Sequence, residues 1–399
     1  MTAVSISNRA PSIVGGEPAF PDGLPLTRPT LPDLAKLERN LGTILESGIL
    51  TNGPTVRTLE EHVAERLGVE HVVAVASCTS GLVLTLQALG VEGRVVVMPS
   101  FTFSASAHAV HWAGGTPRFT DITPDTLCLD PAAAADAVSG ASAMTATHLY
   151  GTPCNTKALQ KAADSASIPL VYDAAHALGS VRRGTPVGGF GTAEVFSLSP
   201  TKVAVAGEGG LVTTHDGGLA ATIRLGRDYG NPGDYDCQFP GLNARMSELH
   251  AAVALHSLKW LDTNVSRRGH LAELFWATLA GLRGLVRPTV DQGDVSTYKD
   301  LTVLVDEAGF GLTAAELGQA LKQEGIDTRR YYYPAIHRQQ AYRMLPERHL
   351  PVTDLAAESV LSLPLWSHMT DLQVLVLADA IRRIQAHADQ IRTALVLQP

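Results

Sequence analysis

The sequence predicts an α/β fold in which a mainly parallel, seven-stranded sheet is covered by helices and is followed by a smaller α+β domain. From about residue 70 to 216, short apolar runs alternate with helical stretches. Continuous apolar strands of this kind are typical of parallel sheets that are buried on both faces. After about residue 245 the alternation stops and long helical stretches begin. The 399 residues are enough for two or three domains.

Seven strands are expected in the first part of the chain. Each is a short run in which β-branched and other apolar residues dominate, bounded by turn residues or by a helical stretch. In chain order they are His71–Ala76, Arg94–Met98, Pro117–Ile122, Ala143–Leu149, Pro169–Tyr172, Glu194–Ser199 and Gly210–His215.

Helices are expected between these strands. Gly81–Leu89 and Ser104–Ala113 follow the first two strands. Asp130 is a typical N-cap and Pro131 a typical first helical residue, so an Ala-rich helix begins there. Asn155 caps a further helix over Thr156–Ala166.

The second part is expected to contain fewer strands and longer helices. Thr313 and Glu316 form a capping box that opens one of these helices. The expected elements are helices over Met246–Trp260, Ser266–Leu282, Thr313–Gln323 and Asp371–Val396, with a strand over Thr297–Val305. We therefore divide the chain into a Pro/Gly-rich extended arm (1–30), a large α/β domain (31–245) and a small α+β domain (246–399).

Composition and charge exclude several classes of protein. Thirty-one basic residues stand against 39 acidic ones, and no long Lys/Arg run exists, so nucleic acid is not the expected partner. The N-terminus lacks the continuous apolar run of a signal peptide, and no apolar run approaches 18 residues. We expect a cytoplasmic protein with no membrane contact. The four cysteines show no CxxC spacing, and no metal site is predicted.

The first strand-to-helix turn, Ser77–Gly81, reads SCTSG and not the GxGxxG of a dinucleotide site. The sequence also lacks GxxxxGK[ST], GxSxG and HExxH. Small hydroxyl residues and free N–H groups at the start of a helix are suited to bind an anion. Many helices begin with Ser or Thr, however, so this turn alone does not distinguish a phosphate site from an ordinary helix cap.

Lys202 has an unusual place among the seven lysines, because it lies between two apolar strands and before the glycine turn GEGG. A lone buried ammonium would cost several kcal/mol. The side chain therefore either reaches solvent or is neutralised, and imine formation with a carbonyl cofactor is one way to neutralise it.

Asp173 closes the apolar strand PLVYD, and Phe103 lies just beyond an earlier strand. A carboxylate at the end of a buried strand needs a cation, and the protonated ring nitrogen of pyridoxal phosphate is one. The alternative is that Asp173 only caps the following turn. Likewise, Phe103 either stacks on a planar cofactor or belongs to the core.

The order of these features resembles the DegT/StrS-type sugar aminotransferases, pyridoxal phosphate enzymes of fold type I in the aspartate aminotransferase superfamily. The resemblance covers the chain from about Leu24 to Ile384. The matching stretches are ILTNGPTVRTLEE, VASCTSGLVLTLQAL, MPSFTFSAS, ATHLYGTPCN, YDAAHALGS, FSLSPTKVAVAGEGG, GLNARMSE, IDTRRYYYPAIH and LSLPLWSHMTD.

The resemblance implies roles for the residues at the strand ends. Lys202 is implied to be the Schiff-base lysine and proton shuttle, Asp173 the partner of the pyridine nitrogen, and Phe103 the ring that stacks on the cofactor. His176 stands near the cofactor's 3-oxygen, where Gln is more usual. The implied phosphate ligands are Thr79, Ser80 and Ser197, together with Asn243 delivered from the neighbouring subunit of a homodimer. Ala244 replaces the usual aromatic residue of that loop.

The segment Arg329–Tyr333 and the nearby His337 combine cations with aromatic rings. Arg329, Tyr331 and His337 are suited to bind a nucleotide diphosphate, since arginine pairs with phosphate and tyrosine stacks. The alternative is a rim loop at the subunit interface. With a net charge of −8, the protein would need such local cations to hold an anionic substrate.

By resemblance, the expected reaction moves an amino group from L-glutamate or L-glutamine to a keto-sugar nucleotide, with a dTDP-4-keto-6-deoxyhexose as the first choice. A 3-keto sugar nucleotide is the nearest alternative. A cyclitol aminotransferase of the scyllo-inosose type and an aminohydroxybenzoate-type synthase would keep the same cofactor residues. A non-catalytic regulatory protein of the same fold is the remaining alternative, and the intact set of Lys202, Asp173 and Ser197 argues against it.

Overall fold

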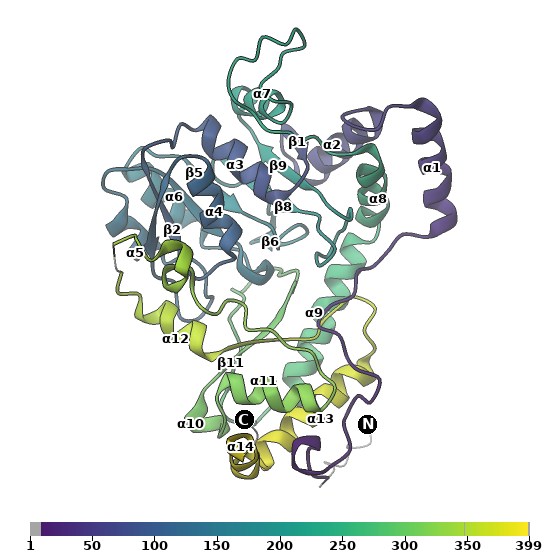
Figure 1. Ribbon diagram of the computed structural model, residues 1–399, viewed down its shortest axis with the longest axis vertical. Coiled ribbons are helices and arrows are strands. Elements are labelled where there is room, and N and C mark those ends of the chain that lie inside the picture. Colours follow the sequence, from purple (N-terminus) through teal and green to yellow (C-terminus); the bar gives the residue numbers. More distant parts are fainter. Residues whose placement is uncertain (1–8, 347, 398–399) are drawn as a thin grey trace.

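The structure is a computed structural model that describes residues 9–346 and 348–397 (Figure 1). Seven strands form one sheet in the order β1-β9-β8-β5-β4-β2-β3. The strand β9 is antiparallel to its neighbours β1 and β8, and all other pairs in the sheet are parallel. The predicted mainly parallel sheet is confirmed. Its strands are β1 (His71–Val75), β2 (Val95–Pro99), β3 (Thr116–Thr120), β4 (Ala141–Thr147), β5 (Leu170–Asp173), β8 (Ala193–Ser197) and β9 (Gly210–Thr214).

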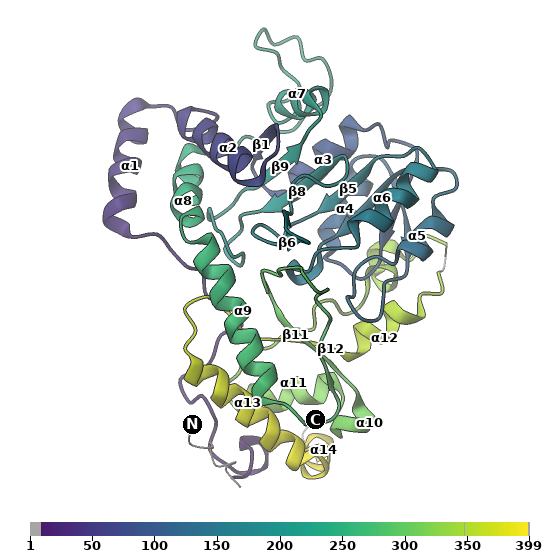
Figure 2. The same cartoon turned by 180° about the vertical axis from the view of Figure 1, so that it is seen from behind.

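Helices cover both faces of this sheet, as Figures 1 and 2 show from opposite sides. Alternate residues of each strand face opposite ways, so Val171 packs in one core cluster while Leu170 and Tyr172 pack in another. One face carries α3 (Cys78–Ala88), α4 (Ser104–Trp112) and α7 (Gly217–Gly226), and the other carries α2 (Pro54–Leu67), α5 (Pro131–Ala137), α6 (Thr156–Ser165) and α8 (Glu248–Leu258).

The predicted helix caps are present. Asp130 accepts a hydrogen bond from Ala132 N at 2.9 Å, with Pro131 at the first helical position, and Asn155 accepts one from Ala158 N. Thr313 and Glu316 form the predicted capping box at the start of α11 (Ala314–Gln323). These side chains satisfy N–H groups that a helix leaves without partners, which is why the local sequence located the helix starts well.

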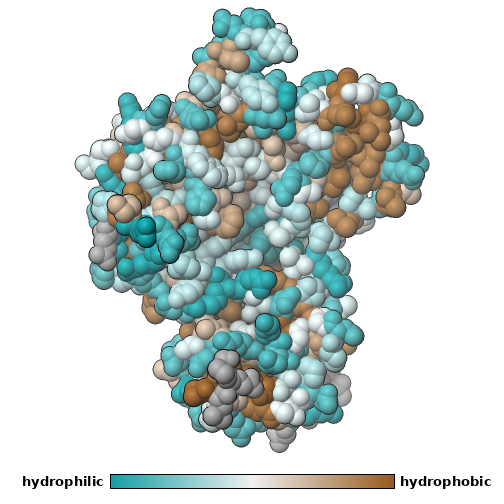
Figure 3. Space-filling view, in the orientation of Figure 1, coloured by the Kyte–Doolittle hydropathy of each residue, from teal (hydrophilic) through white to brown (hydrophobic). Residues whose placement is uncertain are grey.

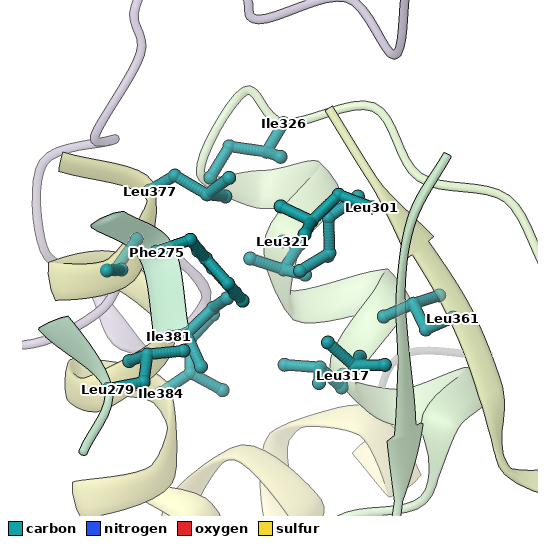
Figure 4. Packing of buried hydrophobic residues seen from close by; sticks show 14 of the residues in the cluster. Phe275, Leu279, Leu301, Leu317, Leu321, Ile326, Leu361, Leu377, Ile381 and Ile384 are labelled. Carbon is teal, nitrogen blue, oxygen red and sulfur yellow. The ribbon is translucent and has the colours of Figure 1, made fainter. Parts of the chain in front are cut away.

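A second, antiparallel sheet of β10 (Leu285–Val286), β11 (Leu301–Val305) and β12 (Val360–Leu363) lies in the C-terminal part of the chain. Its core is drawn in Figure 4, where Phe275, Ile381 and Ile384 from helices face Leu301, Leu317 and Leu361. Leu24, which lies in the predicted arm, packs into the same cluster. The helices of this part are α9 (Leu261–Thr278), α10 (Glu307–Phe310), α11, α12 (Pro351–Ser359), α13 (Asp371–Ala386) and α14 (Ala388–Leu397).

Some sequence predictions for this part were wrong. The helix predicted over Asp371–Val396 is divided at His387, whose φ of −116° and ψ of 21° leave the helical region. The apolar spacing continues across that break, so the pattern could not reveal it. The strand predicted over Thr297–Val305 begins only at Leu301. In the C-terminal part, the strands β10 and β12 and the helices α10 and α12 were not predicted. In the first part of the chain, the strands β6 (Val181–Arg182) and β7 (Thr185–Pro186) and the helices α1 (Leu34–Ser47), α2 and α7 were not predicted.

The C-terminal part returns to the edge at which the parallel strands end, called the carboxyl edge below. Ile336 N donates to Ser100 O at 3.0 Å, directly after β2. Lys299 N donates to Tyr150 O at 2.9 Å, beyond the end of β4. Two segments far apart in the sequence therefore border this edge, although the division of the chain near residue 245 stays a prediction. None of the described helices is long and apolar enough to cross a membrane.

The absence of a side chain at Gly81 allows α3 to pack closely on the sheet. A Cβ atom at Gly81 would lie 2.8 Å from Val195 Cγ1 and 3.0 Å from Val212 Cγ2. We expect Gly81→Ala to lower the free energy of unfolding by about 1–3 kcal/mol, since buried strand side chains would have to shift. Gly269→Ala is the matched control, because a Cβ there meets nothing within 4 Å and the helix should gain about 0.5–1 kcal/mol. Urea unfolding midpoints measure both, and equal shifts would contradict the packing argument.

Candidate active site

The ends of β1, β5 and β8 bring the main candidate residues to one place at the carboxyl edge. Asp173 is the last residue of β5, Ser197 is the last residue of β8, and α3 begins shortly after β1. Cys78 Sγ, in the first turn of α3, lies 3.9 Å from Asp173 Oδ1. The start of α3 and the carboxylate are therefore neighbours. Ligands of open α/β sheets bind at this edge.

The Asp173 carboxylate is buried and held from two sides. Its Oδ2 accepts a hydrogen bond of 2.6 Å from Ser106 Oγ on α4, and its Oδ1 accepts one of 3.1 Å from Ala175 N. The bond from Ala175 is the turn cap that the sequence analysis kept as an alternative. Ser106 is in turn 3.2 Å from Thr102 Oγ1. Asp173 is thus fixed in direction, and the sequence analysis missed Ser106.

The first turn of α3 is arranged to leave N–H groups available. Ser77 Oγ accepts from Ser80 N at 3.1 Å, and Ser80 Oγ donates to Ser77 O at 2.8 Å. The N–H groups of Cys78 and Thr79, at the first two helical positions, have no intrahelical acceptor. Together with the positive end of the helix dipole, they form a site suited to a phosphate group.

Lys202 lies in the connection between β8 and β9, where its backbone N donates to Ser199 O at 3.1 Å. The side chain is partly buried, and among the described residues its amine has no hydrogen-bond partner. Burial and the nearby positive charge of Lys299 lower the pKa of Lys202 to about 8. The charges of Cys78, Asp300 and Asp173 oppose that shift. The amine is therefore partly neutral near pH 8, as a nucleophile or proton acceptor must be.

His176 is a buried, neutral hydrogen-bond donor. Its Nδ1 accepts from Tyr150 N at 3.1 Å, so we assign the ring proton to Nε2. Burial, assisted by the charges of Lys202 and Lys299, holds its pKa well below the usual value of 6.5. The imidazole therefore keeps a neutral N–H near physiological pH.

Aromatic rings form one wall of the site. The ring of Phe103 is 55% exposed and lies 5.9 Å from the ring of Tyr332. Tyr332 also stacks against Tyr150 at 6.5 Å. The Tyr150 hydroxyl donates to the carbonyl of Tyr331, which joins the predicted substrate segment to the carboxyl edge.

The other predicted residues are less closely joined to Lys202. Arg329 is exposed and donates to Thr328 O. His337 lies 2.7 Å from Ser100 Oγ through Nδ1, and its Nε2 is 3.1 Å from Asp354 Oδ1. Asn243 is exposed and accepts from Arg245 Nη2 at 3.2 Å. The roles of these three residues stay predictions.

Sequence reasoning missed a buried ion pair at this site. Lys299 Nζ lies 2.8 Å from Asp300 Oδ1, and both side chains are buried. Thr297 Oγ1 donates to the carbonyl of His176 at 2.5 Å, which places this segment against the site. The available signal was a Lys-Asp dipeptide directly before an apolar strand, in TYKDLTVLV.

The chain is similar to known proteins over most of its length. Residues 34–382 match the sequence profile of the DegT/DnrJ/EryC1/StrS aminotransferase family. The chain is 33% identical over 359 residues to dTDP-4-amino-4,6-dideoxy-D-glucose transaminase of Escherichia coli, with 87% of this chain and 95% of the relative covered.

Two solved structures have the same fold over nearly all of their length. DesI, crystallised with its TDP-sugar product, superposes with a TM-score of 0.91 at 38% identity, covering 96% of this chain and 98% of DesI. DesV of S. venezuelae, in complex with a ketimine intermediate, superposes with a TM-score of 0.83 at 33% identity, covering 90% and 99%.

The lowered pKa of Lys202 predicts a specific pH profile. An amine reacts with acylating reagents when it is neutral, so labelling of Lys202 in the ligand-free protein should be half-maximal near pH 8. For an ordinary lysine, labelling is half-maximal at about pH 10.4. Mass spectrometry after brief labelling across a pH series measures the profile, with the exposed Lys157 as the reference amine. A Lys202 profile that rises only near about pH 10 would contradict the assigned environment.

Proposed function

The chain belongs to the DegT/DnrJ/EryC1/StrS family of pyridoxal phosphate-dependent sugar aminotransferases, and we propose that it transfers an amino group from L-glutamate or L-glutamine to a keto-sugar nucleotide. The observation that carries this proposal is the meeting of three groups at the carboxyl edge. These are a lysine amine of lowered pKa, a buried carboxylate and the open N-terminus of α3. Each matches a different part of the cofactor.

The donor set fits pyridoxal phosphate. The N–H groups at the start of α3 and the hydroxyls of Thr79, Ser80 and Ser197 would hold its phosphate. The Asp173 carboxylate would pair with its ring nitrogen, and His176 Nε2–H would donate to its 3-oxygen. Phe103 would cover one face of the ring. When bound, the cofactor supplies the carbonyl that accepts the amino group and a ring that delocalises an electron pair.

Lys202 Nζ performs the proton transfers. In the first half-reaction its neutral amine would take the proton from the α-carbon of the amino donor and pass it to the cofactor carbon that receives the amino group. In the second half-reaction it would take a proton back from that carbon and give it to the sugar carbon to which the amino group is transferred. Its lowered pKa is suited to both directions, because the group is part protonated and part neutral near pH 8. The kinetics should be ping-pong, because the holoenzyme retains the amino group after the 2-oxo acid leaves and before the keto sugar binds.

The proposed substrate is based on the cationic and aromatic side chains beside the site and on the names of the similar proteins. We infer a dTDP-linked 4-keto-6-deoxyhexose, since the E. coli relative is named as a dTDP-4-amino-4,6-dideoxy-D-glucose transaminase and DesI was crystallised with a TDP-sugar. The Tyr331 ring borders the site, and the exposed Arg329 guanidinium offers charge to a diphosphate. His337 would add to this group from its place beside Ser100.

We further infer a homodimer in which Asn243 reaches the partner's cofactor phosphate. α1 presents an apolar face to solvent, with Leu34 74% exposed and Leu45 61% exposed. Figure 3 shows this face as a hydrophobic patch over α1. A contiguous apolar surface of this kind is typical of a protein interface. The loop after α7 projects at the top of Figures 1 and 2, and Asn243 lies at the base of this loop, where it forms a β-bridge with Asp228.

The first test is the visible absorption of the purified holoenzyme. L-glutamate should bleach the yellow band of the bound pyridoxal phosphate, and a dTDP-4-keto-6-deoxyhexose should restore it. Lys202→Ala should fold and show neither change, because it lacks the amine that moves the proton. Lys157→Ala, on the outer side of α6, is the matched control and should behave like the wild type.

The outcomes separate the alternative functions. If only a 3-keto sugar nucleotide restores the yellow band, the enzyme aminates C3 of the sugar and not C4. If a cyclitol ketone without a nucleotide restores the band, the substrate is not a sugar nucleotide. Protein that binds pyridoxal phosphate but is not bleached by any amino donor would be a non-catalytic relative. Full activity of Lys202→Ala would contradict the mechanism.

If α1 forms the dimer interface, charged substitutions of its exposed leucines should abolish the dimer and the activity together. Leu34→Asp combined with Leu45→Asp should convert a dimer to a monomer in sedimentation velocity, because charge would replace apolar contact at the interface. Activity should fall with the dimer, since Asn243 would no longer reach the partner's site. Leu372→Asp is the control, as it lies exposed on α13. A wild-type monomer, or a double variant that remains dimeric, would show that α1 is not the interface.

A further inference from the structure

Three buried charges lie side by side behind the aromatic wall of the site. Lys299 and Asp300 are paired at 2.8 Å, with side chains only 8% and 5% exposed. Arg268, on α9, is also buried and donates to the carbonyls of Tyr298 and Lys299 at 3.1 and 3.3 Å.

The charges of this cluster do not balance. Among the described residues, Asp300 is the only carboxylate paired with Lys299, and the hydrogen bonds of Arg268 go to carbonyl oxygens and to Ser367 Oγ. Two cations therefore face one anion. Asp300 Oδ2 is a buried acceptor without a hydrogen-bond partner among the described residues, so it is suited to an N–H donor and not to the anion itself. Because a buried uncompensated charge is costly, the cluster is suited to take up a small anion.

Lys299 is built into the wall that holds the reacting groups. Its backbone N donates to Tyr150 O, and Tyr150 N donates to His176 Nδ1. Its Nζ lies 5.2 Å from the centre of the Tyr331 ring. The positive charge of Lys299 also lowers the pKa of both Lys202 and His176, as expected of a cation close to them.

The proposed reaction has two anionic groups that Lys299 could bind, the α-carboxylate of the amino donor and the diphosphate of the sugar nucleotide. The position of Lys299 favours the carboxylate. The carboxylate of an α-amino acid is bonded directly to the carbon that loses its proton, so its cation must lie beside Lys202. A nucleotide diphosphate is several bonds away from the ketone carbon and is larger. It is better matched by an exposed cation such as Arg329 than by one buried behind Tyr331.

We propose that Lys299 is the cation that binds the α-carboxylate of the amino donor. Asp300 is the positioning residue that fixes the place of the Lys299 ammonium, and Arg268 is the second cation, which keeps the cluster positive. This inference rests on the proposed aminotransferase function and adds the donor subsite to it. The bound carboxylate would hold the donor's α-carbon with its hydrogen toward Lys202 Nζ. Asp300 orients the ammonium through Oδ1 without neutralising the whole cluster.

The test compares two substitutions in the holoenzyme. Glutarate, which carries carboxylates but no amino group, is the binding probe in isothermal titration calorimetry. Lys299→Met should weaken glutarate binding and raise the KM for L-glutamate by about tenfold or more, because a charge-assisted contact is lost. The KM for the keto-sugar nucleotide should stay unchanged. Asp300→Asn keeps the cation and removes its competitor, so glutarate should bind equally well or more tightly.

A carboxylate site predicts weaker glutarate binding only for Lys299→Met, whereas a merely structural ion pair predicts the same effect of both substitutions. Equal weakening by Lys299→Met and Asp300→Asn would overturn the inference, as would a loss confined to the nucleotide-sugar half-reaction or no glutarate binding to the wild type. Lys157→Met controls for the loss of a lysine at an exposed site. If Lys299→Met does not fold, Lys299→Arg takes its place and should retain glutarate binding. The measurement on Asp300→Asn then tests the proposal, because weaker glutarate binding in that variant would overturn it.

Failure of the proposed function would be visible separately. In that case L-glutamate would not bleach the wild-type holoenzyme at all, whichever variant binds glutarate. If the wild type is bleached and Lys299→Met keeps the wild-type KM for L-glutamate, only the donor subsite is wrong.

Discussion

Asp173 ends the central strand β5 with a carboxylate that is largely removed from water, and the rest of the site is arranged around that charge. Ser106 Oγ and Ala175 N donate to its two oxygens, which fixes both the start of α4 and the turn after β5. A buried carboxylate with only neutral donors remains costly, so the fold must supply a cation nearby or receive one with a ligand. The pyridinium of pyridoxal phosphate fills that requirement in the proposed function.

The distribution of positive charge follows from the same constraint. The chain as a whole carries a net charge of −8, which does not attract anionic substrates. Lys202, Lys299 and Arg268 nevertheless lie in this part of the molecule. Burial and the charge of Lys299 lower the pKa of Lys202 to about 8, and burial lowers the pKa of Arg268 to about 10, although the charge of Asp300 opposes that shift. In the proposed function, selectivity for anions would come from these buried cations, which outnumber the carboxylate paired with them.

The sequence predicted those elements that depend on interactions between residues close to one another in the chain. All seven strands of the main sheet and the caps at Asp130, Asn155 and Thr313 were predicted, because apolar runs and capping side chains act within a few residues. Ser106 and the Lys299–Asp300 pair were missed because their importance depends on contacts across the fold, between positions such as 106 and 173. The break at His387 was missed because apolar spacing persists on both sides of it. The residue roles that the family resemblance implies remain predictions.

The antiparallel strand β9 has a consequence for the order in which the site can be assembled. It pairs residues 71–75 of β1 with residues 210–214, so β1 has no neighbour in the sheet until most of the large domain has been synthesised. The turn before α3 and the connection that carries Lys202 meet only when β9 inserts between β1 and β8. Such long-range closure is slow compared with helix formation. On the ribosome, the nascent chain would therefore carry an unpaired, apolar β1 for much of its synthesis, and competence to bind the cofactor would arise late and all at once.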